Sequence, residues 1–177
     1  MRSGILVCGL NGSGKSTLGR ELARVLGYTF IDIEDCYFPK KDDSYLYADP
    51  RSGEEAEKVL WDKISACDRF VLASVTGNFD EKTTSLFEAI VRLNVPKEIR
   101  MKRIRERSFR KFGDRMLPGG DLYEAEEGFF AMAEARTEQY VDDWLSGMSC
   151  PVIEVDGTRP IEENTQYLAG RPGCPKI

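Results

Sequence analysis

Residues 9–16 read Gly-Leu-Asn-Gly-Ser-Gly-Lys-Ser, which has the G-x-x-x-x-G-K-S spacing of a phosphate-binding loop. Glycines let such a loop curl so that its backbone N–H groups surround a phosphate at the start of a helix. Lys15 adds a positive charge toward the β- and γ-phosphates, and the Ser16 hydroxyl is positioned to ligate Mg²⁺. The residues that the motif predicts to contact the triphosphate, taken to be that of ATP, are Gly9, Asn11, Gly12, Ser13, Gly14, Lys15, Ser16 and Thr17.

A second group of chemically useful side chains, Asp32 and Glu34, lies at the end of the apolar run 28–33. The carboxyl ends of parallel strands converge on the ligand crevice of an α/β sheet. We therefore expect Asp32 to coordinate Mg²⁺ through water or to accept the proton of an acceptor hydroxyl, with Glu34 sharing that role. The apolar run 69–75 is followed by Thr-Gly-Asn, so no acid is expected after that strand.

Alternating strand and helix patterns surround these residues. They predict an α/β fold, a three-layer P-loop NTPase with a five-stranded parallel sheet in the order 2-3-1-4-5 and a lid segment. The expected strands are 3–8, 28–33, 69–75, 89–95 and 151–155. The expected helices include 18–26, 56–64, 81–86, one that begins at Pro96, a long one over 122–145, and 161–168.

Length and composition limit the domain count and the chemistry. The chain has 177 residues, of which 41% are hydrophobic, and this is enough for one core. We expect a single domain over 1–170, with a substrate-side loop at 36–53 and a lid at 113–123, and a tail at 171–177. The chain has no leader-like N-terminus and no apolar run long enough to span a bilayer, so a cytoplasmic protein without a membrane partner is expected.

Some chemistries are excluded by residue counts. There is no histidine, so His-based nucleophilic catalysis and His-ligated metals are ruled out. Five cysteines without C-x-x-C spacing fit reduced thiols rather than zinc ligands or disulfides. The net charge of −5 argues against a nucleic-acid partner.

These motifs resemble those of the P-loop small-molecule and nucleotide kinases, a group that includes adenylate, shikimate and gluconate kinases. Asp32-x-Glu34 matches the Asp-x-Asp of shikimate-kinase-like proteins, and Arg103 and Arg107 match the arginines four apart of adenylate-kinase-like proteins. Arg136 is similar in position to the arginine that returns to the phosphates after the lid. The Asp-Gly-x-Pro-Arg signature of nucleoside monophosphate kinases is replaced by residues 76–79, Thr-Gly-Asn-Phe, which argues against a nucleotide monophosphate acceptor.

One helical face carries Arg100, Arg103, Arg107 and Lys111, and guanidinium groups suit triphosphate oxygens. The alternative is a solvated face, and a nucleic-acid patch is disfavoured because the segment lacks interleaved aromatic residues.

Two further segments have a functional and a structural interpretation. Arg115 lies in the Gly-rich segment 113–123, where it would close a lid and stabilise the transferring phosphoryl together with Lys15 and Arg107; an ordinary surface loop is the alternative. Thr158 follows the last strand, where related kinases surround the adenine, although a plain turn explains it equally well. The apolar stripe predicted to be core rather than site consists of Phe129, Met132, Ala133, Tyr140 and Trp144.

The predicted activity is an ATP- and Mg²⁺-dependent kinase that transfers the γ-phosphoryl to a small acceptor: a nucleoside, a nucleotide or a hydroxylated metabolite. The alternative is a nucleotide-binding switch with slow hydrolysis and a protein partner. GTP in place of ATP stays open, as does a monomer or a homodimer. The acceptor should lie over the end of the second strand, beside 36–53.

Overall fold

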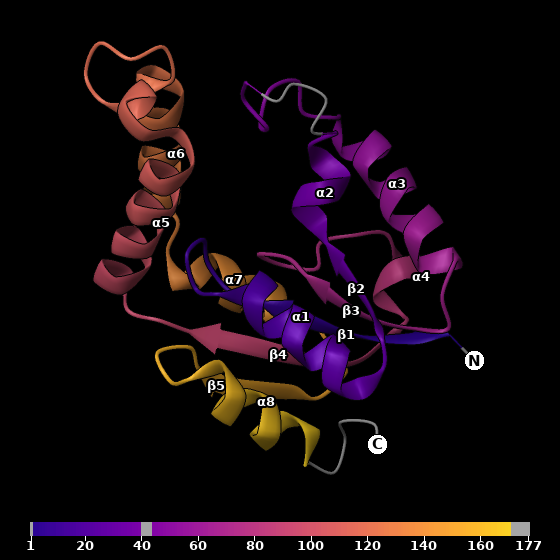
Figure 1. Ribbon diagram of the computed structural model, residues 1–177. Coiled ribbons are helices and arrows are strands. Elements are labelled where there is room, and N and C mark those ends of the chain that lie inside the picture. Colours follow the sequence, from indigo (N-terminus) through magenta and orange to yellow (C-terminus); the bar gives the residue numbers. More distant parts are fainter. Residues whose placement is uncertain (1, 40–43, 171–177) are drawn as a thin grey trace.

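The computed structural model describes residues 2–39 and 44–170, and among them five parallel strands form one sheet (Figure 1). Their order is β2-β3-β1-β4-β5, which confirms the predicted topology. The strands are β1 (Ser3–Cys8), β2 (Thr29–Asp32), β3 (Arg69–Ala73), β4 (Phe87–Asn94) and β5 (Val152–Asp156). The central strand, β1, is the one that leads into the phosphate-binding loop.

Helices follow the strands and cover both faces of the sheet, as right-handed parallel crossovers require. They are α1 (Lys15–Leu26), α2 (Ile33–Tyr37), α3 (Gly53–Ser65), α4 (Glu81–Thr84), α5 (Lys97–Phe112), the 3₁₀ helix η1 (Gly113–Met116), α6 (Tyr123–Ala135), α7 (Glu138–Leu145) and α8 (Ile161–Ala169). Local signals set several ends. Ser52 and Glu55 form a reciprocal capping box at the start of α3, and Gly27 closes α1 in the left-handed conformation with φ 68°.

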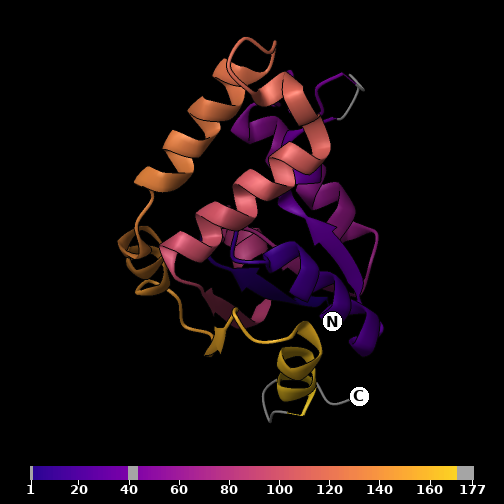
Figure 2. The ribbon, with the colours of Figure 1, turned by 60° about the vertical axis from the view of Figure 1, so that its left-hand side comes forward.

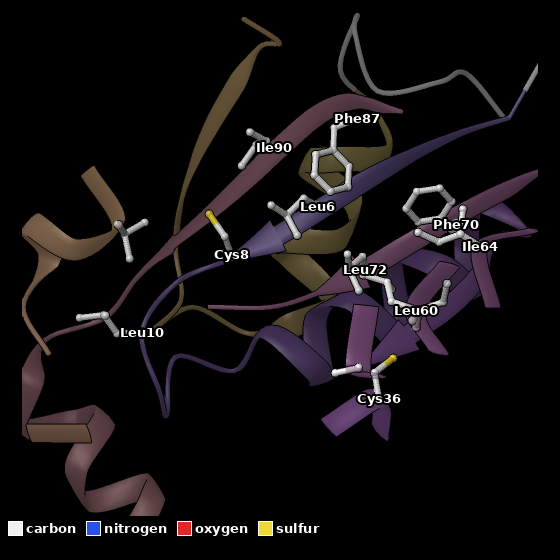
Figure 3. Packing of buried hydrophobic residues seen from close by; sticks show 13 residues of the cluster. Leu6, Cys8, Leu10, Cys36, Leu60, Ile64, Phe70, Leu72, Phe87 and Ile90 are labelled. Carbon is white, nitrogen blue, oxygen red and sulfur yellow. The ribbon is translucent and has the colours of Figure 1, made fainter. Parts of the chain in front are cut away.

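The core has two parts, one on each face of the sheet, because side chains alternate along a strand. Ile5 and Val7 of β1 pack with α1 and α8, whereas Leu6 and Cys8 pack with α3 and α7. Figure 3 shows the second of these clusters, in which Leu6 and Phe70 lie among side chains of the neighbouring strands and of α3. The three layers of the predicted fold are thereby confirmed.

The α5–η1–α6 segment forms a helical hairpin that projects away from the sheet (Figure 2). It has a small core of its own, made by Ile104, Met116, Phe130 and Ala133. The predicted lid, 113–123, is the tip of this hairpin: Gly113 ends α5, η1 follows, and α6 begins at Tyr123.

The long helix predicted over 122–145 is wrong. The structure has two helices, α6 and α7, because Arg136 and Thr137 take extended backbone angles, with ψ of 124° and 165°. Thr137 precedes the first turn of α7, a position where threonine is favoured. The break turns the chain from the hairpin back toward the sheet, and it brings Arg136 to the phosphate-binding loop.

Other boundaries differ from the prediction by a few residues. The second strand ends at Asp32 and α2 begins at once, so the expected loop 36–53 starts inside a short helix. The short helix expected over 81–86 ends at Thr84, and β4 begins earlier than expected, at Phe87. Part of that loop, 40–43, and the predicted tail, 171–177, lie outside the described residues. Within the described ranges, no helix combines the length and the apolar character that crossing a membrane requires.

Replacing Phe70 by alanine should destabilise the fold, because its ring is fully buried between β3 and α3. We expect the free energy of unfolding, measured by urea denaturation, to fall by about 3–5 kcal/mol. Phe109→Ala is the matched control, because that ring is 50% exposed and should lose much less. Equal losses in the two variants would contradict this account of the core.

Candidate active site

The phosphate-binding loop joins β1 to α1, and its backbone depends on glycine at two points. Gly12 has φ 82°, and a Cβ at this position would lie 2.5 Å from the carbonyl oxygen of Arg100. Gly14 has φ 96° and precedes the first turn of α1. Both angles lie in the left-handed region that L side chains avoid. The loop thus wraps tightly around the helix N-terminus, where backbone N–H groups favour an anion.

Arg100 has a structural role: it donates hydrogen bonds to the backbone of this loop and of the preceding strand end, and it does not line the cleft. Its side chain is buried, and its guanidinium donates from Nε to the Val95 carbonyl oxygen (3.2 Å) and from Nη1 to the Asn11 carbonyl oxygen (3.1 Å). Lys111 likewise lies elsewhere and donates to the Tyr47 hydroxyl (3.0 Å). The predicted basic face therefore does not act as a unit, because helix α5 turns its first arginine into the protein.

Lys15 lies at the base of the main cleft. Its ammonium donates to the Leu10 carbonyl oxygen (3.2 Å). Burial lowers the pKa of Lys15 to about 8, while the charges of Glu34 and Asp32 oppose that decrease. A lysine whose charge is disfavoured by burial and only partly balanced by carboxylates is well suited to receive a phosphate.

The cleft has a volume of about 570 Å³ and is formed by the loop, by α2, by the segment after β3 and by the hairpin. This size is typical of small-molecule sites. The charged side chains that line it are Lys15, Asp32, Glu34, Arg103, Arg107 and Arg136. Asn11, Gly12, Gly14, Ser16 and Thr17 line it as well, whereas Gly9 and the buried Ser13 shape the loop from behind.

The two carboxylates of this cleft are held by the start of α2. Asp32 is the N-cap residue, and its Oδ1 accepts a hydrogen bond from the Glu34 backbone N–H (3.1 Å). This capping fixes Asp32 at the edge of the sheet and leaves its second oxygen available to the cleft. Hydroxyl and carboxylate oxygens such as those of Ser16 and Asp32 are the kind of donor that Mg²⁺ prefers.

Each of the three arginines of the cleft has a different role in it. Arg103 donates to the carbonyl oxygens of Ser13 (3.4 Å) and Gly157 (3.1 Å and 3.2 Å), so it ties the loop to the turn after β5. Arg136 donates to Asn11 Oδ1 (2.9 Å) and lies over the Tyr140 ring. Arg107 makes no hydrogen bond or ion pair with the described residues, so its guanidinium is available to a ligand.

Besides Gly9 and Ser13, two predicted site residues, Arg115 and Thr158, lie outside the cleft lining. Arg115 pairs with Asp121 (2.6 Å) and donates to the Ser44 carbonyl oxygen (2.6 Å), so it holds the hairpin tip against the segment after α2. Thr158 donates its backbone N–H and its hydroxyl to Asp156 Oδ1 (2.9 Å and 2.6 Å), which is the plain turn of the alternative interpretation.

Cysteine is not a candidate base. Burial raises the pKa of Cys8 to about 12 and that of Cys36 to about 11, so both thiols stay protonated at neutral pH. With no histidine in the chain, the candidates for a base in the cleft are the two carboxyl groups that line it, those of Asp32 and Glu34.

Sequence reasoning missed the aromatic lining of the cleft. Phe129, Met132 and Tyr140 were predicted to be core, yet they line the cleft, and Met132 and Tyr140 are exposed. Ala133 is buried as predicted, and Trp144 packs against the core. The division falls within each helix, since α6 and α7 both contribute residues to the cleft and to the core. Thr137, a favoured N-cap residue, is the sequence signal for the break between the two helices. The other aromatic lining residues are Tyr37, Phe38 and Phe79.

Sequence comparisons identify relatives of this chain. A family model described as an AAA domain matches residues 5–115. The uncharacterized protein YqaC of Bacillus subtilis (strain 168) is 28% identical over 176 residues, which cover 95% of this chain and 96% of that protein.

Solved structures share the fold at low sequence identity. A shikimate kinase from Bacteroides thetaiotaomicron has a TM-score of 0.60 and 19% identity, with 94% of this chain and 96% of that chain covered. A gluconokinase from Sinorhizobium meliloti 1021 has a TM-score of 0.54 and 15% identity, with 94% and 90% covered. A deoxyadenosine kinase from M. mycoides has a TM-score of 0.53 and 14% identity, with 93% and 96% covered. Because the family model spans more than half of the chain, the chain belongs to the AAA domain family, and its fold is that of the P-loop small-molecule kinases.

Proposed function

We propose that this protein is a kinase that uses ATP and Mg²⁺ to phosphorylate a hydroxyl group of a small molecule. The observation that carries the proposal is the shared cleft, in which the phosphate-binding Lys15 and the free guanidinium of Arg107 lie with the carboxylates of Asp32 and Glu34. Phosphoryl transfer needs these two kinds of group together, cations for the transferring phosphate and a carboxylate for the attacking hydroxyl.

Each side chain has a specific task in this scheme. Lys15 and the loop N–H groups hold the β- and γ-phosphates, and Arg107 stabilises the charge that develops on the transferring group. Of Asp32 and Glu34, one accepts the hydroxyl proton and the other holds the metal. Arg103 and Arg136 bind loop oxygens, so their first task is to keep the phosphate-binding backbone in shape.

Ser16 and Asp32 fit a Mg²⁺ ion by donor chemistry, because they offer oxygen ligands at the same cleft as the phosphate-binding loop. When bound, the ion neutralises phosphate charge and aligns the leaving group.

The structural neighbours support a small acceptor, since they are a shikimate kinase, a gluconokinase and a deoxyadenosine kinase. The competing function is an ATP-hydrolysing switch that signals to a protein. A panel of nucleosides, sugars and hydroxy acids separates the two functions: a compound that strongly stimulates ADP release and becomes phosphorylated supports the kinase. Slow hydrolysis that no compound stimulates would support the switch instead.

Replacing Lys15 by alanine should lower acceptor-dependent ADP formation by about a hundredfold or more, because a phosphate charge loses its buried partner. Lys102→Ala is the matched control, since this lysine side chain is 76% exposed on α5, is not part of the cleft lining, and should leave the rate unchanged. Rates of both variants are measured with a coupled ADP assay. A Lys15 variant with wild-type turnover would refute the assignment of the loop.

Asp32→Asn should keep the fold, because asparagine caps a helix as well as aspartate does, but it removes the negative charge. We expect turnover to fall by about a hundredfold. Titration with Mg²⁺ then assigns the role: a higher half-saturating concentration identifies a metal ligand, and an unchanged one identifies the base. Glu34→Gln is measured in parallel. Asp35→Asn, at an exposed position outside the cleft lining, is the control.

Arg107→Lys should lower kcat by about tenfold or more, because an ammonium group does not reproduce the two parallel hydrogen bonds of a guanidinium. Arg110→Lys, an exposed position on the same helix, should leave kcat unchanged. Thermal midpoints confirm that both variants are folded. Equal rates for the two variants would exclude Arg107 from the phosphoryl site.

A further inference from the structure

The charged side chains of the cleft are divided between its two sides. The cations belong to the phosphate-binding loop and to the hairpin side, where Arg103 and Arg136 donate to the loop itself. The opposite side, called here the α2 wall, consists of those residues within 32–38 and 73–79 that line the cleft, namely 32–34, 37, 38, 73–76, 78 and 79. The charged residues of this wall are Asp32 and Glu34, both acidic.

Aromatic rings occupy much of the remaining lining. Tyr37, Phe38 and Phe79 belong to the α2 wall, and Phe129 comes from the hairpin beside Met132. Tyr37, Phe38, Phe79 and Phe129 are half-buried, and Met132 is 39% exposed. Burying the apolar surface of such side chains under a flat ligand ring stabilises the complex, and stacking between aromatic rings adds to that stabilisation.

A bridge of aromatic side chains connects the two sides of the cleft. The Phe38 ring contacts Tyr47 with centroids 5.2 Å apart, and Tyr47 contacts Phe112 of α5 at 6.3 Å. The Tyr45 hydroxyl donates to Glu126 of α6 (3.0 Å), which reinforces the same connection. This Phe38–Tyr47–Phe112 bridge therefore joins the α2 wall, through its lining residue Phe38, to α5 of the hairpin.

From these features we infer that the phosphoryl acceptor is a nucleoside, an uncharged compound with a flat heterocycle and sugar hydroxyl groups. A heterocycle stacks on the aromatic rings, and a sugar hydroxyl donates a hydrogen bond to whichever of the carboxylates of Asp32 and Glu34 does not hold the metal. A carboxylate or phosphate of the acceptor placed beside that carboxylate would instead be repelled by its charge. This inference about the acceptor rests on the proposed kinase function.

In that reaction, an oxygen of a nucleoside hydroxyl forms a bond to the γ-phosphorus of ATP. The bond between the γ-phosphorus and the β,γ-bridging oxygen breaks, and ADP leaves with that electron pair. The hydroxyl proton passes to Asp32 or Glu34. The products are a nucleoside monophosphate and ADP.

The first test compares acceptors of different charge and shape. The common ribo- and deoxyribonucleosides are assayed beside glucose, gluconate, shikimate and a nucleoside monophosphate, and ADP and phosphorylated product are both quantified. A nucleoside should raise ADP formation by about tenfold or more over every other compound, with one product molecule per ADP. If gluconate, shikimate, glucose or the monophosphate is the best acceptor, the kinase stands and the nucleoside inference falls.

Calorimetry separates the pocket from the reaction. The same nucleosides are titrated into the protein saturated with Mg²⁺ and a non-hydrolysable ATP analogue, which fills the nucleotide site. Binding of a nucleoside without turnover would support the pocket and overturn the proposed kinase. The absence of both binding and turnover would overturn the inference.

A pair of ring deletions tests the stacking. Phe79→Leu and Phe129→Leu keep apolar volume but remove the ring, so we expect the KM for the nucleoside to rise by about tenfold while the KM for ATP stays unchanged. Phe109→Leu is the control, since this ring is 50% exposed and is not part of the cleft lining. Equal rises in both KM values, or no rise at all, would show that the rings do not stack on the acceptor.

Discussion

The hydrogen bonds from Arg100 to the carbonyl oxygens of Val95 and Asn11 are the constraint on which the site depends. They lock the first turn of α5 onto the phosphate-binding loop, where a Cβ on Gly12 would meet the Arg100 carbonyl oxygen. A buried guanidinium needs such partners, because leaving its donors unsatisfied costs several times the value of an ordinary hydrogen bond. The loop and α5 therefore have one relative position, and Arg103 and Arg107 follow from it one and two turns later.

The same constraint explains what the sequence could and could not reveal. Loop, sheet order and strand-end carboxylates follow from local spacing and from the rule that parallel strands direct their carboxyl ends to one edge. The role of Arg100 cannot be predicted from local spacing. Helical spacing puts Arg100 on one face with Arg103 and Arg107, but it does not indicate which part of the protein that face contacts. Its burial is a tertiary property of the turn between β4 and α5.

The helix break at Arg136 was not predicted from the sequence. An apolar pattern over 122–145 has helical periodicity on both sides of the break, so periodicity alone predicts one helix. Two consecutive extended residues, Arg136 and Thr137, end α6 and redirect the chain into α7. The aromatic lining of the acceptor side could not be predicted for a different reason: its rings, Tyr37, Phe38, Phe79 and Phe129, come from segments far apart in the sequence that meet in the folded chain.

The Phe38–Tyr47–Phe112 bridge gives the hairpin a second attachment besides its base at the phosphate-binding loop. A segment attached at two points stays in place when one contact is lost, because the remaining contact keeps the two surfaces at a high effective concentration. Ring contacts of this size are individually worth about 1 kcal/mol, and hydrogen bonds from Arg115 to the Ser44 carbonyl oxygen and from Tyr45 to Glu126 add to them. The hairpin therefore keeps its place beside the α2 wall when any one of these contacts is lost, while the hydrogen bond from Arg103 to the Ser13 carbonyl oxygen keeps its base in register with the phosphate-binding loop.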